Sequence, residues 1–524
     1  PHRPIPDPAT CHLVADPDIV LKAKGFDLEI SFFYSTASQP GGVMWGNRRS
    51  ASVNMQIKID QVNGNVNVIR GDGKVYGFSG IWAPSTPTSM TPNPTLYSGT
   101  ELLWDGSQFI ETFPDGKTVT YGEELQADTY YAVSEIEDLS GNVHAYTYDG
   151  INLIRIEVPG GNRVTFHYDG DGHVEMVQDW GDRRWLMTYD EFDQLETYTL
   201  PTGCQTQYFY PGDNGLVNAI MDPRGYVSSY TFNDFDRVET MSLGTATWTY
   251  TYYQYAGGPL GSRVESPTGA ITTYLLDSVG FTIAKEVPEG YIISYAYDAT
   301  GNKIIEEMPY GHVLSLTYNA SNLPLTSRDP LGNVTTYNYD VNNNLVSLMN
   351  ALGEVTTMTY DGQRRMTSRM DALGRVTSNV WNTDGTLKAQ VDGRGLRTTY
   401  AYDAVGNLAS TLYADHSVST YTYDVLNRRI SAKDPLGRVT TTAYDAVDHI
   451  VSIMNAAGEI STFIYDSCFL QQKVNPLGYR TTYTYERYGK VRTVKNALGQ
   501  VTTTNYDNMG YPVTIQNALG YVTT

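Results

Sequence analysis

Short stretches rich in β-branched and aromatic residues alternate with polar turn sequences along most of this chain. The stretch Val334-Thr-Thr-Tyr-Asn-Tyr339 is followed by the polar segment Asp340-Val-Asn-Asn-Asn344 and then by Leu345-Val-Ser-Leu-Met349. The outer segments have the composition of pleated strands, and the middle segment has that of a turn. The pattern predicts a β-hairpin. No stretch from residue 131 onward has a sustained helical spacing of apolar residues.

The hairpin pattern recurs at a fixed period. An aromatic residue followed by Asp or Asn returns every 21 residues, as in the steps 318 − 297 and 339 − 318. A period of this kind indicates a repeat architecture, and a residue present in every unit is expected to have a structural role. The residues to which we assign this role are Tyr297, Asp298, Tyr318, Tyr339, Asp340, Tyr360, Asp361, Tyr402, Asp403, Tyr423, Asp424, Tyr444, Asp445, Tyr465 and Asp466.

Each unit carries two turns. In the first, Asp forms a turn with its own downstream backbone, and glycines such as Gly301 and Gly406 supply the positive φ that closes the hairpin. The second is a segment such as Asp329-Pro-Leu-Gly332 or Asn350-Ala-Leu-Gly353, in which Gly takes the strained position. Two strands and two tight turns per unit leave no room for helices.

The two strand faces are predicted to differ. Leu345, Ser347 and Met349 recur as equivalent triplets in later units, which indicates one buried and one wetter face. The small central residue predicts close approach of a group such as a neighbouring tyrosine ring. Val334 and Tyr339 should point to opposite faces unless a bulge intervenes.

The repeats are predicted to span residues 131–524, about eighteen units, with an insertion or an irregular hairpin between Tyr253 and Asp277. Residues 1–130 are not periodic but also have β composition, and we predict a capping or plug-like domain that protects the first repeat. The chain ends inside a Val-Thr-Thr strand motif, so we expect it to be a fragment that continues beyond residue 524.

An isolated hairpin is not stable in water, but stacked hairpins cover one another's edges. Such a sheet curls as it twists, and this chain lacks the bulky apolar content of a long filled core. The predicted fold class is therefore all-β: a spiral of stacked hairpins forming a curled hollow shell or tube, preceded by a β-rich N-terminal domain.

The composition limits the classes of function that are open to this chain. A net charge of −21, from 57 acidic and 36 basic residues, argues against a nucleic-acid-binding surface. The sequence contains no run of 18 apolar residues, so no membrane-spanning helix is predicted. The three cysteines, Cys11, Cys204 and Cys468, lie far apart at different repeat positions, so we expect thiols and neither a disulfide framework nor a metal site.

A search for catalytic motifs finds none. His167 and His173, with Asp169 and Asp171 between them, are a candidate metal site, but a polar turn is the favoured interpretation. We therefore predict no catalytic residue, no cofactor, no metal and no enzymatic activity. Rows of exposed tyrosines would suit carbohydrate stacking only if the rings point outward.

The units Gly332-Asn-Val-Thr-Thr-Tyr-Asn-Tyr339-Asp340 and Gly437-Arg-Val-Thr-Thr-Thr-Ala-Tyr444-Asp445 resemble the YD repeats of the rearrangement-hotspot (RHS) proteins. Residues 1–130 resemble the domain that precedes such repeats, at Phe33-Tyr34-Ser35, Trp45-Gly46 and Asp72-Gly73. The resemblance implies a hollow β-shell, which encloses a C-terminal toxic domain in toxin members and forms a surface scaffold in others. The Asp-Pro-x-Gly-Leu cleavage motif of toxin members is not matched, so no protease role is carried over.

These features predict a non-enzymatic, secreted or cell-surface scaffold forming a shell, tube or filament. One alternative is the encapsulating shell of an RHS-type toxin whose toxic domain lies beyond this chain. Another is a carbohydrate-binding adhesin. The corresponding partners are an enclosed C-terminal domain, glycans or cell-surface molecules, or further copies of the chain.

Overall fold

The structure is a computed structural model of the 524-residue chain. It describes residues 18–524 except 36–43, 46, 73, 80–81, 83–85, 93–99, 128, 255–259, 279, 467, 487–488 and 508–510. Cys11, Gly46 and Gly73, which the sequence analysis singled out, lie outside the described residues. Within the described part, the one helical element is the 3₁₀ turn Pro309–Gly311, and every other element is a strand.

The N-terminal part contains a small sheet and the beginning of a long one. The small sheet is formed by β1 (Asp18–Leu21), β2 (Leu28–Tyr34) and β3 (Arg49–Ala51), in that order. The long sheet begins with strands that pair in the order β11-β12-β4-β5-β6-β7-β8-β9-β10-β13. The N-terminal strands of the long sheet are β4 (Gln56–Ile59), β5 (Val66–Ile69), β6 (Val75–Ser79), β7 (Thr88–Pro92), β8 (Glu101–Trp104), β9 (Phe109–Thr112), β10 (Thr118–Tyr121), β11 (Glu123–Gln126) and β12 (Tyr130–Ala132).

From β13 to β50 each strand pairs antiparallel with the next, as stacked hairpins require. We divide this ladder into a packed section, β13–β25, and an open section, β26–β50, because their burial differs. The packed section comprises β13 (Glu135–Glu137), β14 (Val143–Asp149), β15 (Asn152–Glu157), β16 (Arg163–Tyr168), β17 (Val174–Gln178), β18 (Arg184–Tyr189), β19 (Leu195–Thr199), β20 (Gln205–Phe209), β21 (Ala219–Met221), β22 (Val227–Phe232), β23 (Val238–Leu243), β24 (Ala246–Gln254) and β25 (Leu260–Glu265).

The open section continues the same ladder through the most regular repeats. It comprises β26 (Ile271–Leu276), β27 (Thr282–Glu286), β28 (Ile292–Tyr297), β29 (Lys303–Met308), β30 (His312–Tyr318), β31 (Pro324–Arg328), β32 (Val334–Tyr339), β33 (Leu345–Met349), β34 (Val355–Tyr360), β35 (Met366–Met370), β36 (Val376–Trp381), β37 (Leu387–Val391), β38 (Arg397–Tyr402), β39 (Leu408–Leu412), β40 (Val418–Tyr423), β41 (Arg429–Lys433), β42 (Val439–Tyr444), β43 (Ile450–Met454), β44 (Ile460–Tyr465), β45 (Leu470–Val474), β46 (Arg480–Tyr485), β47 (Val491–Lys495), β48 (Val501–Tyr506), β49 (Pro512–Gln516) and β50 (Val522–Thr523).

In most units a β-bulge lies beside the aromatic residue that recurs every 21 residues. In the hairpin β32–β33, Asn338 pairs with Ser347 but Tyr339 pairs with Leu345, so one residue is skipped. The skipped residue, Val346, belongs to β33, so no bulge lies between Val334 and Tyr339 in β32, and these two residues point to opposite faces as expected. Bulges increase the local right-handed twist of a strand pair, and a repeated bulge makes a long sheet coil.

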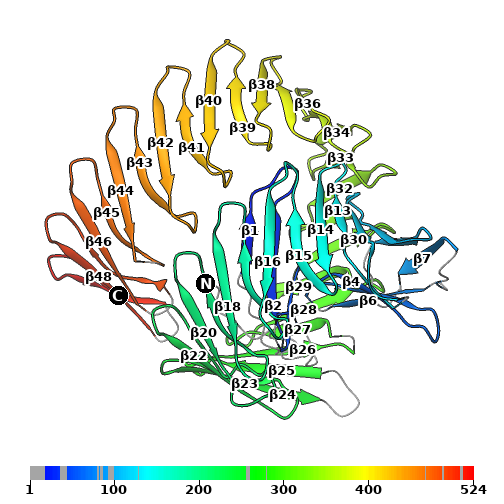
Figure 1. Ribbon diagram of the computed structural model, residues 1–524, viewed down its shortest axis with the longest axis horizontal. Helices are drawn as coiled ribbons and strands as arrows, with labels where there is room; N and C mark the ends of the chain where they lie inside the picture. The colour runs from blue at the N-terminus through cyan, green and yellow to red at the C-terminus, as the bar shows by residue number, and fades with distance from the viewer. Residues whose placement is uncertain are drawn as a thin grey trace.

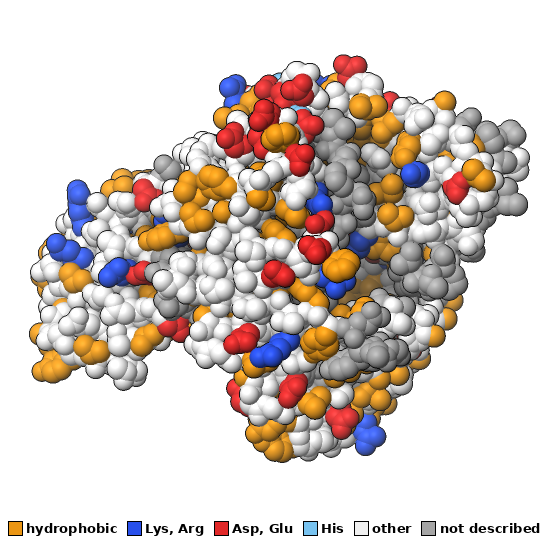
Figure 2. All heavy atoms as spheres, turned by 90° about the horizontal axis from the view of Figure 1, so that it is seen from below, with side chains coloured by type: hydrophobic (Ala, Val, Ile, Leu, Met, Phe, Trp, Pro, Cys, Tyr) orange, Lys and Arg blue, Asp and Glu red, His pale blue; other side chains and the backbone are white. Residues whose placement is uncertain are grey.

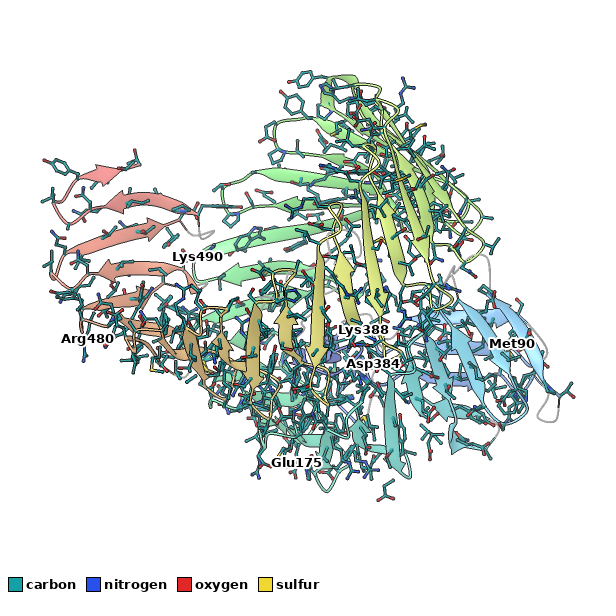
Figure 3. The ribbon with its side chains drawn as sticks, turned by 90° about the horizontal axis from the view of Figure 1, so that it is seen from above. Met90, Glu175, Asp384, Lys388, Arg480 and Lys490 are labelled. Carbon is teal, nitrogen blue, oxygen red and sulfur yellow. A yellow bond between two sulfur atoms is a disulfide. The ribbon has the colours of Figure 1, made fainter. Side chains whose placement is uncertain are left out.

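The coil is visible in the ribbon. In Figure 1 the hairpins of β38–β48, yellow to red, form an arc above the arc of β14–β22, cyan to green. Figure 3 shows the sheet from above, with Arg480 and Lys490 at its left end, Asp384 and Lys388 near the middle and Met90 at the right. The predicted all-β fold of stacked hairpins in a curled sheet is confirmed.

The hydrophobic core lies at one end of the ladder. It runs from Ile19 to Tyr250 and joins β1–β3 to the packed section. In the open section the buried hydrophobic side chains are Leu276, Ala389 and Leu426. The sheet there is a single layer with half-buried side chains on its faces.

One expectation about the strand faces was wrong. Ser347 does not make room for a tyrosine ring, because its Oγ accepts a hydrogen bond from Asn338 Nδ2 at 2.9 Å on the exposed face. The same cross-strand position pairs Thr317 with Thr326 and Thr484 with Thr493 through their hydroxyls. The small polar residues at this position form a hydroxyl ladder on the outer face.

Candidate functional site

The aspartates of the repeat build turns. We call the five residues that follow each repeat aromatic, such as 340–344, the YD turn, and the five residues of the second turn, such as 329–333, the Gly turn. Asp340 Oδ1 accepts hydrogen bonds from the backbone N–H groups of Asn342 and Asn344, both at 2.9 Å. Equivalent pairs of bonds are made by Asp298, Asp361, Asp403, Asp424, Asp445 and Asp466.

These bonds favour the charged carboxylate. Burial raises the pKa of Asp298, but hydrogen bonds from Asn302 and Thr300 outweigh it and lower the pKa to about 2. The carboxylates are therefore occupied by their own turns. That arrangement suits a structural role and leaves little capacity for an external ligand.

The tyrosine hydroxyls are occupied too. Most donate a hydrogen bond to a backbone carbonyl 15 residues earlier, on the preceding hairpin, as in Tyr339 to Pro324 at 3.0 Å. The same bond is made by Tyr297, Tyr318, Tyr360, Tyr402, Tyr423 and Tyr444. Tyr465 instead stacks on His449 with ring centroids 4.4 Å apart. Most of these hydroxyls thus link one hairpin to the one before it.

The inner face is the face of the ladder that covers the core. In the packed section its cross-strand pairs are apolar or aromatic, among them Phe166 with Val177, Tyr208 with Ile220 and Tyr230 with Met241. Strands β2 and β3 and Trp45 pack on this face. Phe32 contacts Tyr198 with ring centroids 5.8 Å apart, and Trp45 contacts Phe166 at 6.2 Å.

A buried tyrosine anchors this packing. Tyr34 is fully buried, donates to Gly215 O at 3.0 Å and accepts from Val217 N at 2.9 Å. Arg49 lies over the ring of Tyr208 at 4.5 Å. Burial raises the pKa of Tyr34, so the hydroxyl stays neutral.

In the open section the same inner positions have mixed chemistry. The pairs include Met358 with Arg369, Asn379 with Gln390, and Phe463 with Lys473. Tyr337 with Leu348 and Tyr483 with Val494 keep an aromatic–aliphatic pair. An inner face that alternates polar and apolar groups differs from a core surface, which would be uniformly apolar.

Successive coils of the ladder meet at a seam. We define the seam as the line along which Gly turns of residues 138–226 contact YD turns of residues 382–486. Gly160 and Gly181 occupy the third position of their Gly turns and make room for Val405 and Leu426, at the third position of their YD turns. A Cβ atom added to Gly181 would lie 2.3 Å from Leu426 Cδ2.

Polar contacts reinforce the seam. Arg183, itself buried, binds Asp448 at 3.0 Å, and Trp180 donates to Val425 O at 2.9 Å. Arg224 donates to Glu486 O at 2.7 Å and lies over Phe469 at 4.4 Å. These contacts join residues about 245 to 265 apart in the sequence, so one coil contains about twelve repeats of this length.

A disulfide crosses the seam. Cys204, the fifth residue of a Gly turn, is bonded to Cys468, in a YD turn, with Cα atoms 5.9 Å apart and a sequence separation of 264 residues. The expectation of thiols was therefore wrong for these two cysteines. The two cysteines belong to the two turn classes that the seam brings together. The sequence alone carries no signal for this bond, because the pairing of the two turn classes is set by the seam.

The candidate metal residues do not converge. His173 lies 3.2 Å from Asp169 and 3.4 Å from Asp193, and its ring stacks on Tyr189. His167 contacts Thr165. Among the described residues no group of three or more His, Cys, Asp or Glu side chains could hold a metal ion.

The chain carries an excess of acidic residues, and no described helix is long and apolar enough to cross a membrane. Figure 2 shows acidic side chains gathered on one part of the lower surface. Exposed acidic residues of the packed section that lie in or beside YD turns include Asp149, Asp171, Glu191 and Asp193.

The fold, the turn chemistry and the seam together define a β-shell scaffold of the YD-repeat class. Residues 325–468 match the family model described as Teneurin YD-shell. This match lies within the predicted repeats and supports the resemblance to the RHS/YD-repeat family.

Solved structures with a similar course of the chain include complexes of TcdB2 and TccC3. The crystal structure of TcdB2-TccC3-TEV has 14% identity and a TM-score of 0.46, with 94% of this chain and 28% of that chain covered. The Photorhabdus luminescens Tc holotoxin pore has 10% identity and a TM-score of 0.41, with 98% and 33% covered. The chain thus spans about a third of the length of these structures. No curated protein matches it in sequence.

Proposed function

We propose that this chain is a non-enzymatic, secreted or cell-surface scaffold whose spiral forms the wall of a hollow shell. The main support for this proposal is the seam, because its contacts join successive coils of a single-layer sheet into a continuous wall. The YD-shell family match over residues 325–468 supports the same role. In this proposal residues 1–130 act as a plug, since β2 and β3 fill the inner face of the packed section.

The disulfide supports the location. Bonds between cysteines persist in oxidising compartments and are rare where thiols are kept reduced. Cys204–Cys468 joins two coils and holds the wall closed only outside the reducing cytosol. Intact mass measured with and without alkylation before reduction tests this: the secreted protein should carry no free thiol at Cys204 or Cys468.

A second candidate is a shell that encloses a polypeptide, as in RHS-type toxins. The observation that favours it is the inner face of the open section, where Arg369, Gln390 and Lys473 interrupt the apolar pairs. A mixed lining avoids the tight hydrophobic adhesion that would trap a folding intermediate. The enclosed partner would be a domain carried by the same polypeptide.

Electron microscopy of the full-length natural protein, combined with intact mass, distinguishes the two. A closed particle with internal density and a separate C-terminal fragment supports an enclosed domain. A hollow wall with one uncleaved chain supports the scaffold alone. A flat or extended sheet without coil-to-coil contacts would contradict both.

A further inference from the structure

The inner face of the open section carries positive charge without a matching carboxylate. Arg369, Arg429 and Lys473 are exposed there, and Lys285 is half-buried. Across their strand pairs, Lys285 and Lys473 stand opposite an inner aromatic residue and Arg369 stands opposite Met358. In the described part of the chain none of these four cations forms an ion pair. We call these four residues the inner cations.

Aromatic rings of the same face hold three of the inner cations in position. The pairs are Lys285 over Tyr274, Arg429 over Tyr421 and Lys473 over Phe463, with the cation 5.6 to 5.7 Å from the ring centroid. The face of a ring attracts a cation without satisfying its N–H groups as hydrogen-bond donors. These donors therefore remain for an acceptor that comes from outside the sheet.

Arginines in the turns of the same section are neutralised locally. Each binds the aspartate that begins its own turn, at 2.6 to 2.7 Å, in the pairs Arg365–Asp361, Arg375–Asp371, Arg428–Asp424 and Arg438–Asp434. Strands β26–β49 contain three carboxylates, Glu286, Glu306 and Glu307. Glu306 is the one on the inner face, opposite Tyr295, and Lys303 neutralises it. The inner face is thus cationic on a chain whose net charge is −21.

Neighbouring coils do not cover this face. The seam joins turns to turns, so a coil stacked on another coil covers a rim and leaves the inner face open to the space that the spiral surrounds. The charge on this face is therefore available to a partner inside the spiral.

The spacing of the inner cations indicates the kind of partner. Arg369, Arg429 and Lys473 lie on β35, β41 and β45, so they are separated by about 20–30 Å along the sheet. A nucleic-acid strand carries one charge about every 3.4 Å and needs a much denser row of cations. Isolated cations beside aromatic rings suit single carboxylates on the surface of a polypeptide.

We propose that the inner face of the open section binds an acidic polypeptide. The inner cations pair with its carboxylates, and the neighbouring rings contact its apolar side chains. This inference rests on the proposed hollow shell, and it states the chemistry of the partner that the second candidate function would enclose.

The test compares two variants of the full chain with the same change in charge. The inner variant combines R369Q, R429Q and K473Q. The outer variant combines R397Q, K433Q and R480Q, which remove exposed cations from the opposite face of the sheet. Because none of these six side chains forms an ion pair among the described residues, both variants should melt at the temperature of the unchanged chain.

Fluorescence anisotropy with a short labelled oligoglutamate gives the result. We expect the unchanged chain and the outer variant to bind it, and added salt to weaken the binding. The inner variant should bind about tenfold more weakly, because exposed charge pairs contribute little singly but add up over three sites. An unchanged chain that does not bind, or an equal loss in both variants, would overturn the proposal.

Two controls separate the alternatives. A labelled single-stranded oligodeoxynucleotide of the same length should bind more weakly than the oligoglutamate, and tighter binding would assign the face to nucleic acid instead. Electron microscopy of the same sample reports on the wall itself. A hollow wall that does not bind oligoglutamate overturns this inference alone, whereas an extended sheet contradicts the proposed function as well.

Discussion

The packed and open sections share one repeat but stabilise it differently. In the packed section the inner face is buried against β1–β3 and its cross-strand pairs are apolar. In the open section the same positions carry Arg369, Gln390 or Lys473, and few side chains are fully buried. What both sections keep is the turn chemistry. The repeat is therefore specified by its turns and ladder, and the inner face is left to vary with its surroundings.

We expect the largest difference between the two sections at equivalent positions of the inner face, where side chains contribute unequally to the free energy of unfolding. Tyr208 and Tyr421 occupy the same inner position, with Arg49 and Arg429 over their rings at 4.5 and 5.6 Å. Tyr208 is 5% exposed and Tyr421 is only half-buried. Truncating Tyr208 to Ala should cost about 3–5 kcal/mol, because it leaves a cavity, and Y421A should cost about 1 kcal/mol. Chemical denaturation measures both, and equal losses would remove the distinction between the sections.

The seam disulfide is expected to have the next largest effect. The C204A/C468A double variant opens a loop of 264 residues in the unfolded chain. A loss of about 2–5 kcal/mol is expected from cross-links of this kind. Reduction of the unaltered protein should produce the same loss, and the double variant should be insensitive to reductant. Proteolysis should then cut first in the open section. A reduced protein as stable as the oxidised one would show that the seam holds without its covalent bond.

His144 should make the packed section sensitive to acid. It is 2% exposed and stacks on Phe26 at 3.8 Å, and burial lowers its pKa to about 4. Its pKa in the unfolded chain is near 6.5, so the unfolded state binds the proton first. Stability is complete above pH 6.5 and falls by up to about 3 kcal/mol as the pH drops to 4. Denaturation at several pH values should show this slope, and H144F should flatten it.

The smallest effect concerns two glycines in equivalent backbone conformations. Gly406 and Gly458 have φ of +90° and +80°. Added side chains strain both, at a cost of about 1–3 kcal/mol. A Cβ at Gly406 would also lie 2.8 Å from Lys24, while Gly458 faces open space. G406A should therefore lower the melting temperature more than G458A. The reverse order would indicate that the contact between Lys24 and the open section is weak.

Much of this architecture could be read from local sequence. The 21-residue period, the strands and both turns follow from residues close together in the chain, such as Asp340 and Asn344. The bulge at Val346, opposite Tyr339, could not be placed from the sequence, because hairpins with and without it share a composition. The seam could not be predicted, since the number of repeats per coil depends on twist accumulated over about twelve units. For that reason the partners Arg183 and Asp448, or Cys204 and Cys468, looked unrelated.

The disulfide also fixes the number of repeats. Near-identical units such as those ending at Tyr444 and Tyr423 invite the loss or gain of one unit without damage to any hairpin. Removing 21 residues between Cys204 and Cys468 would shift by one unit the seam contacts that span the deletion and place Cys468 opposite a different turn. The bond therefore forms only when the number of intervening hairpins is correct. A variant that has lost or gained one repeat would carry two free thiols, at Cys204 and Cys468.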